Sequence, residues 1–189
     1  MKVSKLCKRL FIAMAILIVL TAAVLFTLFK LVEHNIASRL APPVLQQESI
    51  RAPDMIYRTL DGRLASVSSG KGKVVFLNLW GTWCVQCVAE MPTVQKLYNH
   101  YRSDPDVEFL IVSRLDSPAA VRSYARRNHL ELPFYVTEDA DIPPAMQLNQ
   151  YPSTFIYAKD GSIVAQHAGA SDWSSKSVIE FIDHLRREP

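Results

Sequence analysis

The chain has 189 residues, which allows one ordinary domain and an additional segment but not two full domains. Its formal net charge is +3 at pH 7. Four basic residues lie among the first nine, so the chain after residue 9 is close to neutral. No stripe of Lys and Arg interleaved with aromatic residues is visible, so the sequence gives no support for nucleic-acid binding.

The segment 10–29, LFIAMAILIVLTAAVLFTLF, contains no charged residue, proline or glycine. Twenty helical residues rise about 30 Å, which matches the hydrocarbon core of a bilayer. We therefore predict a basic cytoplasmic region over 1–9 and a transmembrane anchor over 10–32. By the positive-inside rule, the basic residues before the span stay in the cytoplasm, and the rest of the chain lies outside the cytoplasmic membrane. These basic residues are Lys2, Lys5, Lys8 and Arg9.

The apolar run is longer than the core of a secretory signal peptide, which is about 7–15 residues. The following KLVEHNIASRL offers no small-x-small cleavage site directly after the run, so we expect a retained, single-pass anchor. Residues 33–52 contain Pro42, Pro43 and paired glutamines without a clear period, which indicates a flexible tether reaching roughly 25 Å. A folded domain is expected over 53–189.

Hydrophobic patterns predict alternating strands and helices in this domain. MIYRTLDGRLASV (55–67) alternates around Asp61-Gly62 and indicates a hairpin. KVVFLNLW (73–80) and VEFLIVS (107–113) are continuous apolar runs, typical of buried central strands. Helices are expected from Cys84 to about Tyr101, over 117–130 with Ser117 as the cap, and over about 174–187.

Shorter elements complete the pattern: a strand near 134–136, a helical piece at 144–149, and strands over 153–158 and 162–167 joined at Asp160-Gly161. This order predicts an α/β fold. The sheet is expected to be mixed, parallel at its centre and closed by an antiparallel hairpin, with helices on both faces.

Two of the three cysteines lie in LNLWGTWCVQCVAEMP (77–92), between a predicted strand and a predicted helix. Cys84 falls at the first turn, where unpaired N–H groups and the helix dipole favour a thiolate. Thiols of such Cys-x-x-Cys sites have pKa values of about 3.5–7.5, against about 8.5 for an ordinary cysteine. We expect Cys84 to be the exposed nucleophile and Cys87, on the apolar side, to be the resolving thiol. Cys7 precedes the span and cannot pair with them.

Two other roles for the pair are weaker. A disulfide that closes so short a loop constrains the unfolded chain only slightly, so pure stabilisation is a poor explanation. A zinc site needs a second pair of ligands, and the sequence beyond the span has no further cysteine. We expect no metal, because the histidines also show no ligand spacing, and exchange between the two thiols needs no bound cofactor. The histidines are His34, His100, His129, His167 and His184.

The segment FLNLWGTWCVQCVAEMP closely resembles the active-site segment of thioredoxin-fold proteins, specifically the TlpA/ResA-like group of membrane-tethered thiol-disulfide oxidoreductases. The N-terminal anchor, APDMIYRTLDGRLASV ahead of GKVVFLNLW, and the late YPSTFIYAKDGSIVAQHAG match the same group. So do Glu90 and Pro92 after the cysteines. The resemblance covers about residues 52–187. It implies a thioredoxin-like fold, a central mixed sheet flanked by helices, with an N-terminal transmembrane helix.

The resemblance also implies roles for residues around the sulfurs. Tyr151–Pro152 is expected to be a cis peptide beside the disulfide, where its backbone receives a substrate chain. Trp80 and Trp83 are expected to pack under and beside the disulfide, the alternative for both being a core aromatic residue. The intervening Val85-Gln86 lacks the proline common there, which leaves the redox potential open.

Glu90 matches a family glutamate that assists proton movement as Cys87 becomes a thiolate. A partly buried carboxyl group has a raised pKa and can exchange protons near neutrality. The alternative is an ordinary exposed helix glutamate. Asn78 stands where cytoplasmic thioredoxins keep a buried aspartate, so that proton route is missing and Glu90 becomes the better candidate.

The leading hypothesis is an exported disulfide reductase whose only redox group is the Cys84–Cys87 pair. Cys84 attacks a substrate disulfide, and Cys87 then releases the product. The resemblance points to a transmembrane thiol carrier of the DsbD/CcdA kind as electron donor. Substrates would be envelope proteins, among them apocytochrome c cysteines (cytochrome c maturation) or another oxidoreductase.

Two alternatives remain. An oxidase or isomerase of the same fold differs only in potential, where about 30 mV corresponds to 1.4 kcal/mol. The chain shows no large additional helical domain or dimerisation module, which favours the reductase. A Sco-type copper-binding assembly factor spaces its cysteines by three residues and adds a distal histidine, for which His167 is a weak counterpart.

Overall fold

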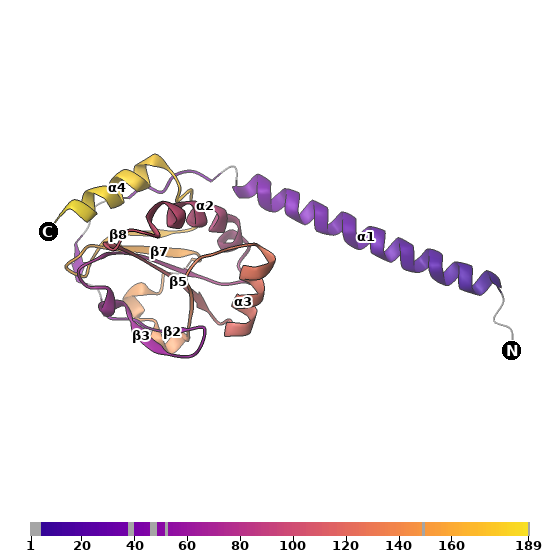
Figure 1. Ribbon diagram of the computed structural model, residues 1–189, viewed down its shortest axis with the longest axis horizontal. Coiled ribbons are helices and arrows are strands. Elements are labelled where there is room, and N and C mark those ends of the chain that lie inside the picture. The colour runs from indigo at the N-terminus through magenta and orange to yellow at the C-terminus, as the bar shows by residue number, and fades with distance from the viewer. Residues whose placement is uncertain (1–4, 38–39, 46–48, 52, 149, 189) are drawn as a thin grey trace. The chain divides into compact units, whose positions relative to one another are not determined.

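The structure is a computed structural model that describes residues 5–37, 40–45, 49–51, 53–148 and 150–188 (Figure 1). Parts of the predicted cytoplasmic region 1–9, of the predicted tether 33–52 and of the helical piece predicted to reach Asn149 lie outside the described residues. The chain divides at Leu40 into two compact units, an N-terminal helix and a folded domain.

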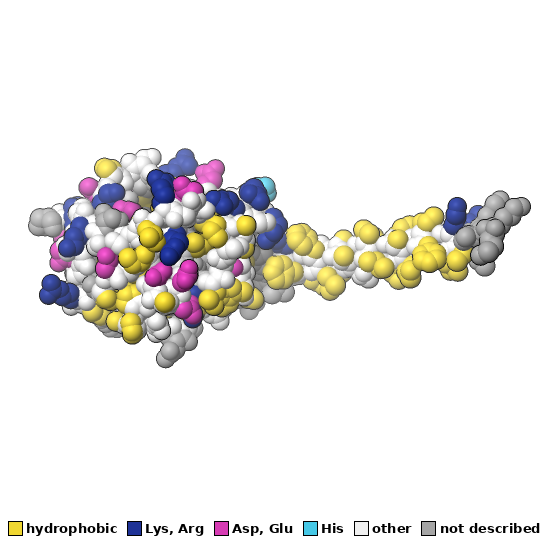
Figure 2. Space-filling model, turned by 90° about the horizontal axis from the view of Figure 1, so that it is seen from below, with side chains coloured by type: hydrophobic (Ala, Val, Ile, Leu, Met, Phe, Trp, Pro, Cys, Tyr) yellow, Lys and Arg dark blue, Asp and Glu magenta, His cyan; other side chains and the backbone are white. Residues whose placement is uncertain are grey.

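The N-terminal unit is helix α1 (Lys5–Ala37). Its large apolar side chains from Leu10 to Leu31 are exposed, and Figure 2 shows them along the rod of the helix. The stretch Cys7–Leu31 is long and apolar enough to cross a membrane, and it is the one such helix in the part of the chain that the structure describes. An apolar surface of this length is unfavourable in water, which agrees with the predicted anchor.

Among the residues that the structure describes, one sheet of eight strands organises the domain, in the order β1-β8-β7-β4-β5-β6-β2-β3. Strands β4, β5 and β6 run parallel, whereas β7 is antiparallel to both β4 and β8, as the sequence predicts. Gly161 (φ +85°) serves the left-handed turn between β7 and β8. The strands are β1 (Ile50–Arg51), β2 (Ile56–Thr59), β3 (Leu64–Ser66), β4 (Val74–Trp80), β5 (Val107–Arg114), β6 (Phe134–Thr137), β7 (Ser153–Tyr157) and β8 (Ser162–Ala168).

Three α-helices follow the predicted positions: α2 (Val85–Tyr101), α3 (Pro118–Arg127) and α4 (Lys176–Arg187). Ser117 caps α3 by accepting a hydrogen bond from the Ala120 N–H at 3.2 Å, and Pro118 occupies the first turn. Single turns of 3₁₀ helix lie at η1 (Val67–Gly70), η2 (Asp139–Asp141) and η3 (Pro144–Met146).

The alternating side chains of β4 divide the core into two clusters, one on each face of the sheet. Phe76 and Trp80 belong to the cluster that contains the buried side chains of α2, α3 and α4, which we call the helix-side core. Leu77 and Leu79 belong to the cluster formed with β2, η1, η3 and β7. The buried side chains of α2, α3 and α4 thus all belong to the cluster on one face of the sheet. The other face is covered by the short 3₁₀ turns η1 and η3, so the predicted helices on both faces are found only in this reduced form.

The predicted tether differs from the structure, because part of it packs on the domain. Strand β1 pairs antiparallel with β8, and the carbonyl of Ala41 accepts a hydrogen bond from the Asp172 N–H at 2.9 Å. Pro43 is buried, and Leu45 packs against the helix-side core. The edge of β8 offers unpaired backbone groups, which β1 satisfies. The domain therefore starts near Leu40 and not at residue 53.

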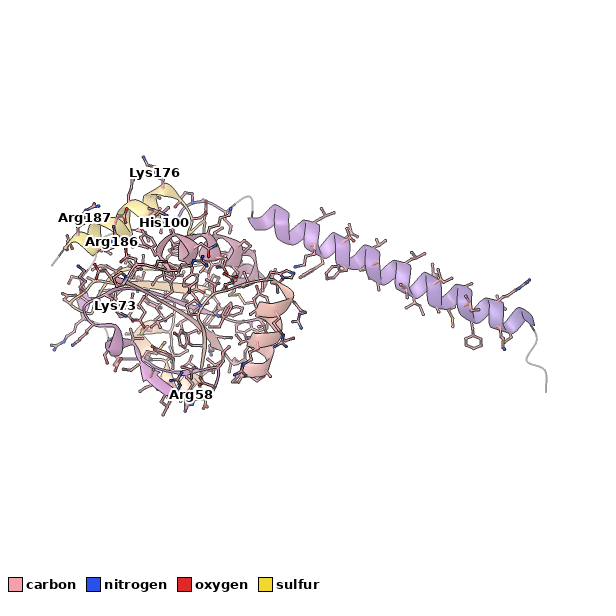
Figure 3. All side chains as sticks on the ribbon, viewed as in Figure 1. Arg58, Lys73, His100, Lys176, Arg186 and Arg187 are labelled. Carbon is pink, nitrogen blue, oxygen red and sulfur yellow. A yellow bond between two sulfur atoms is a disulfide. The ribbon has the colours of Figure 1, made fainter. Side chains whose placement is uncertain are left out.

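Acidic and basic side chains are interspersed over the face of the domain that Figure 2 shows. The basic residues labelled in Figure 3 lie at the periphery of the domain, on β2, α2, α4 and the residue before β4. Four of them face carboxylates, which balances their charge locally. These pairs are Arg58–Asp141, Lys73–Glu108, Lys176–Glu180 and Arg186–Asp104.

Candidate active site

Cys84 and Cys87 form a disulfide at the junction of β4 and α2, with their Cα atoms 5.2 Å apart. Cys84 is the N-cap residue of α2, and its sulfur accepts a hydrogen bond from the Cys87 N–H at 3.2 Å. This places one sulfur at the positive end of the helix dipole and gives it a backbone donor. Both features favour a thiolate at Cys84 when the bond is reduced.

The two sulfurs differ less in exposure than the sequence predicts. Cys87 is fully buried, as expected, but only 8% of Cys84 is exposed. Both cysteines belong to the helix-side core together with Trp80. In the disulfide form, Cys84 is therefore a nearly buried residue at the rim of the core, and the expectation of an exposed Cys84 is wrong for this form.

The loop ahead of Cys84 is fixed by Asp116, which sequence reasoning missed. Its carboxylate accepts hydrogen bonds from the Thr82 N–H and hydroxyl, both at 2.7 Å, and from the Ser113 hydroxyl at 2.6 Å. The preceding Leu115 has φ +63°, a left-handed conformation that leucine rarely adopts. The sequence does contain a signal for this contact. Thr82 follows β4 and Asp116 follows β5, and the carboxyl ends of these parallel strands meet at one edge of the sheet.

Trp83 forms an exposed aromatic surface beside the disulfide loop, with 51% of its area accessible. Its indole N–H donates to the Arg114 carbonyl at 3.2 Å, and its ring meets Tyr151 edge-on at 5.9 Å between centroids. A side chain at Gly81 would clash with the indole, which explains a glycine in the WGTW segment. The Tyr151–Pro152 peptide is cis, as the family resemblance implies.

Arg114 and Tyr151 also line a cavity of about 380 Å³ next to this surface, together with Asp139, Ile142, Gln147 and Leu148. The Arg114 guanidinium donates to the Tyr151 hydroxyl at 3.0 Å and to Asp139 at 2.6 Å. The hydrogen bond from Arg114 holds the pKa of Asp139 below its usual range. The cavity is thus polar on one side, and the site gains a feature that the sequence did not predict.

Glu90 is fully buried one helical turn after Cys87, so the alternative of an exposed helix glutamate is wrong. Its carboxylate accepts hydrogen bonds from the Asn78 amide at 2.8 Å, the Ser171 N–H at 3.0 Å and the Trp173 indole N–H at 2.8 Å. Burial raises the pKa of Glu90 to about 7, against the lowering effect of these three donors. A carboxyl group of this kind exchanges its proton near neutral pH.

The other expected site residues fall in two groups. Trp80 is a fully buried core residue that packs on Tyr124 and Phe134, and its indole N–H has no hydrogen-bond partner among the described residues. Val85 and Gln86, between the cysteines, are exposed. Trp80 shares the helix-side core with the two cysteines, and Val85 and Gln86 lie between the cysteines, so all three residues belong to the site.

His167 belongs to the surroundings of Glu90. Its Nε2 lies 2.8 Å from the Ser171 hydroxyl, and its ring meets Trp173 edge-on. Burial lowers the pKa of His167. Within the described part of the chain, no three His, Cys, Asp or Glu side chains are grouped as metal ligands.

Comparison with known proteins places this geometry in a family. The Redoxin family profile matches residues 47–180. The chain is 31% identical over 161 residues to the thiol-disulfide oxidoreductase ResA of Bacillus thuringiensis, which covers 85% of this chain and 88% of the relative. It is also 31% identical to ResA of Bacillus subtilis, over 83% of each chain. The crystal structure of a candidate thiol-disulfide oxidoreductase from Bacteroides vulgatus superposes with a TM-score of 0.62 at 28% identity, covering 71% of this chain and 93% of the other.

Proposed function

Since the chain belongs to the Redoxin family as a thiol-disulfide oxidoreductase of the ResA type, we propose that it is a membrane-anchored, extracytoplasmic disulfide reductase of envelope proteins. The observation that carries this proposal is the Cys84 sulfur at the amino end of α2, disulfide-bonded to Cys87 one turn before the buried Glu90.

In the first step, the reduced Cys84 thiolate attacks one sulfur of a substrate disulfide. A Cys84–substrate disulfide forms, the substrate S–S bond breaks, and one substrate sulfur leaves as a thiolate that takes a proton from water. The Cys87 N–H and the helix dipole stabilise the attacking thiolate. Cys84 therefore acts as the nucleophile at neutral pH.

In the second step, Cys87 loses its thiol proton to Glu90 and attacks Cys84. The Cys84–Cys87 disulfide forms, and the second substrate sulfur leaves as a thiolate that takes a proton from water, while Glu90 returns the Cys87 proton to water. Two electrons thus pass from the enzyme to the substrate, and the protons are exchanged through water. Glu90 suits the transfer because its pKa is about 7 and because residues three apart on a helix lie on the same face.

Substrate binding is assigned to the exposed apolar side chains around the disulfide loop. Trp83, Val85 and Leu115 are between 51% and 65% exposed, although each is large and apolar. Tyr151 packs against Trp83 and borders the neighbouring cavity, which has room for a substrate side chain. The cis Tyr151–Pro152 backbone is assigned the pairing with the extended substrate chain.

The domain is assigned to the outer side of the cytoplasmic membrane by the basic residues before the span. In an oxidising compartment a reductase needs a supply of electrons, and we assign this role to a membrane thiol carrier of the DsbD/CcdA kind. Disulfides of the envelope, including those of apocytochrome c, are the proposed substrates. Neither a metal nor a further cofactor takes part in these steps.

The direction of electron flow is tested by the reduction potential of the Cys84–Cys87 pair. We expect a value nearer to that of thioredoxin, about −270 mV, than to that of the oxidant DsbA, about −120 mV. Equilibration of the full chain with glutathione and dithiothreitol buffers measures it. A value near that of DsbA would replace the reductase by the oxidase or isomerase alternative.

A trapping experiment tests the activity itself. In cells, full-length Cys87→Ala should accumulate mixed disulfides through Cys84, because the resolving thiol is gone. The matched Cys84→Ala variant should accumulate almost none, since Cys87 is fully buried. Mass spectrometry of the trapped species identifies the substrates. Equal yields from both variants, or an uncaptured Cys84 in the first, would refute exchange with proteins.

A further inference from the structure

The loop between β8 and α4 supplies two of the hydrogen-bond donors of Glu90. The Ser171 backbone N–H donates to Glu90 Oε2 at 3.0 Å, and the Trp173 indole N–H donates to the same oxygen at 2.8 Å. The Trp173 backbone N–H donates to the hydroxyl of Thr93, on α2, at 3.2 Å. Residues 171 and 173 are therefore fixed to α2.

The residue between them is held by a distant part of the chain. The backbone N–H of Asp172 donates to the carbonyl of Ala41 at 2.9 Å. The Asp172 side chain accepts hydrogen bonds from the Ser174 N–H and hydroxyl, at 3.0 and 2.7 Å. The segment 171–173 thus lies between α2 and residues 40–45, which we call the strap.

The strap is suited to hold a fixed position. Two prolines follow Ala41, and proline fixes its own φ and favours an extended conformation in the residue before it. The strap therefore loses little conformational freedom when it docks. Pro43 is buried, and Leu45 packs against the helix-side core, to which Trp173 also belongs. Val44 between them points away from the domain and is 74% exposed.

We infer that the strap is a positioning segment of the active site, which holds residues 171–173 against α2 and so keeps Glu90 dry and both donors on its Oε2. It acts through Asp172 and the helix-side core. The alternative is a strap that only adds stability to the domain. The catalytic use of Glu90 rests on the proposed function, but the effect of the strap on the Glu90 carboxyl group does not.

The titratable groups that face Glu90 come from α2, β8 and the loop itself. The neighbouring β4 and β7 contribute Asn78 and Thr154, which carry no charge. The strap, LAPPVL, contains no titratable side chain, so its release changes burial and hydrogen bonding but no nearby charge. The titratable groups are the Cys84–Cys87 pair, which does not titrate in the disulfide form, Asp172, and His167, whose Nε2 lies 2.8 Å from the Ser171 hydroxyl.

Release of the strap should move Glu90 toward the behaviour of a carboxyl group in water. Burial is the main cause that raises the pKa of Glu90 from 4.5 to about 7. A loosened segment 171–173 admits water, and water then replaces the two donors, so the pKa of Glu90 falls. A strap that only stabilises the domain would lower the free energy of unfolding when altered and leave this pKa unchanged.

The test uses nuclear magnetic resonance of the oxidised full chain in lipid nanodiscs, with ¹³C-carboxyl-labelled glutamate. The Glu90 signal is the one absent from Glu90→Gln. Leu45→Asn weakens the apolar contact of the strap without adding a charge, and it should lower the Glu90 midpoint by about one pH unit or more. The matched Val44→Asn alters the exposed side of the strap and should leave the midpoint unchanged.

Leu130→Asn controls for lost stability. Leu130 also packs against the helix-side core, but from the segment that follows α3. This substitution should lower the free energy of unfolding without moving the Glu90 midpoint. An unchanged midpoint in folded Leu45→Asn, or an equal shift in Leu130→Asn, would overturn the inference.

Pro42→Gly provides a test should Leu45→Asn fail to fold. The Pro42 side chain is exposed, so the substitution mainly gives the released strap more conformational freedom. Hydrogen exchange at the Ser171 and Asp172 amides should become about two- to fivefold faster, the equivalent of about 0.4–1 kcal/mol. Unchanged exchange at both amides would overturn the inference.

Failure of this inference and failure of the proposed function are separable. The titration and the exchange measurement need no substrate and no reduced cysteine. A lowered Glu90 midpoint in Leu45→Asn together with an inactive trap would support the role of the strap and refute only the exchange chemistry. An active trap with an unmoved midpoint would do the reverse.

Discussion

Replacing Glu90 by glutamine removes a buried carboxyl group while keeping its shape. The glutamine oxygen can still accept from Ser171 and Trp173, and its amide can pair with Asn78, so the fold should persist. What changes is the response of stability to pH. Folding raises the pKa of Glu90 from 4.5 to about 7, mainly through burial.

The sign follows from proton binding. Between pH 4.5 and 7 the folded protein keeps the Glu90 proton, whereas the unfolded chain releases it. The free energy of unfolding therefore falls as the pH rises through this range. The stabilisation is complete below about pH 4.5 and lost above about pH 7, and it amounts to about 3 kcal/mol.

Denaturant unfolding followed by tryptophan fluorescence measures this difference, since all three tryptophans lie in the domain. The full chain is kept oxidised in a mild detergent and unfolded at pH 4.5 and pH 8. Burial lowers the pKa of His167, which makes stability rise with pH, but His167 is present in both proteins and cancels in their difference. From pH 4.5 to pH 8, the free energy of unfolding of the unsubstituted chain should fall by about 3 kcal/mol more than that of Glu90→Gln. Parallel pH dependences would refute the burial argument.

Three further substitutions probe the site. Trp173→Phe removes a donor to the ionised Glu90 and should raise its pKa above 7 by one pH unit or more, seen in its carboxyl ¹³C signal; an unchanged midpoint would contradict the assigned hydrogen bond. Asp116→Ala leaves three donors without an acceptor and should lower the free energy of unfolding by about 2 kcal/mol in denaturant titrations, whereas no loss would mean that the loop does not depend on it. Trp83→Ala should cost less than about 1 kcal/mol of stability because the ring is half exposed. It should nevertheless raise the KM for a protein disulfide about tenfold while sparing small disulfides, and equal effects on both would argue against a docking role.

The regular elements could be predicted because local patterns decide them. The buried run of β4 and the Ser117–Pro118 start of α3 are complete signals within a few residues. The position of Cys84 at the start of α2 follows from the same strand-to-helix pattern. The expectation of a reactive thiol at Cys84 could therefore be derived from the sequence.

Other features depend on contacts between distant residues. Whether Glu90 is buried could not be decided from its helix, because its partners Ser171 and Trp173 lie more than 80 positions away in the sequence. Residues 40–45 and 49–51 show no period of their own, and the place of β1 on the domain depends on the open edge of β8. Such features are settled by tertiary packing, which a local pattern does not contain.

The account depends most directly on the acidity of the Cys84 thiol. The reduced full chain, in a Cys7→Ser background, is pulsed with iodoacetamide between pH 4 and pH 10, and mass spectrometry follows the peptide that carries Cys84. We predict half-maximal alkylation at a pH between about 3.5 and 7.5, the range of thiols held at helix N-termini. A midpoint near pH 8.5, the value of an ordinary cysteine, would contradict the assignment of Cys84 as the nucleophile.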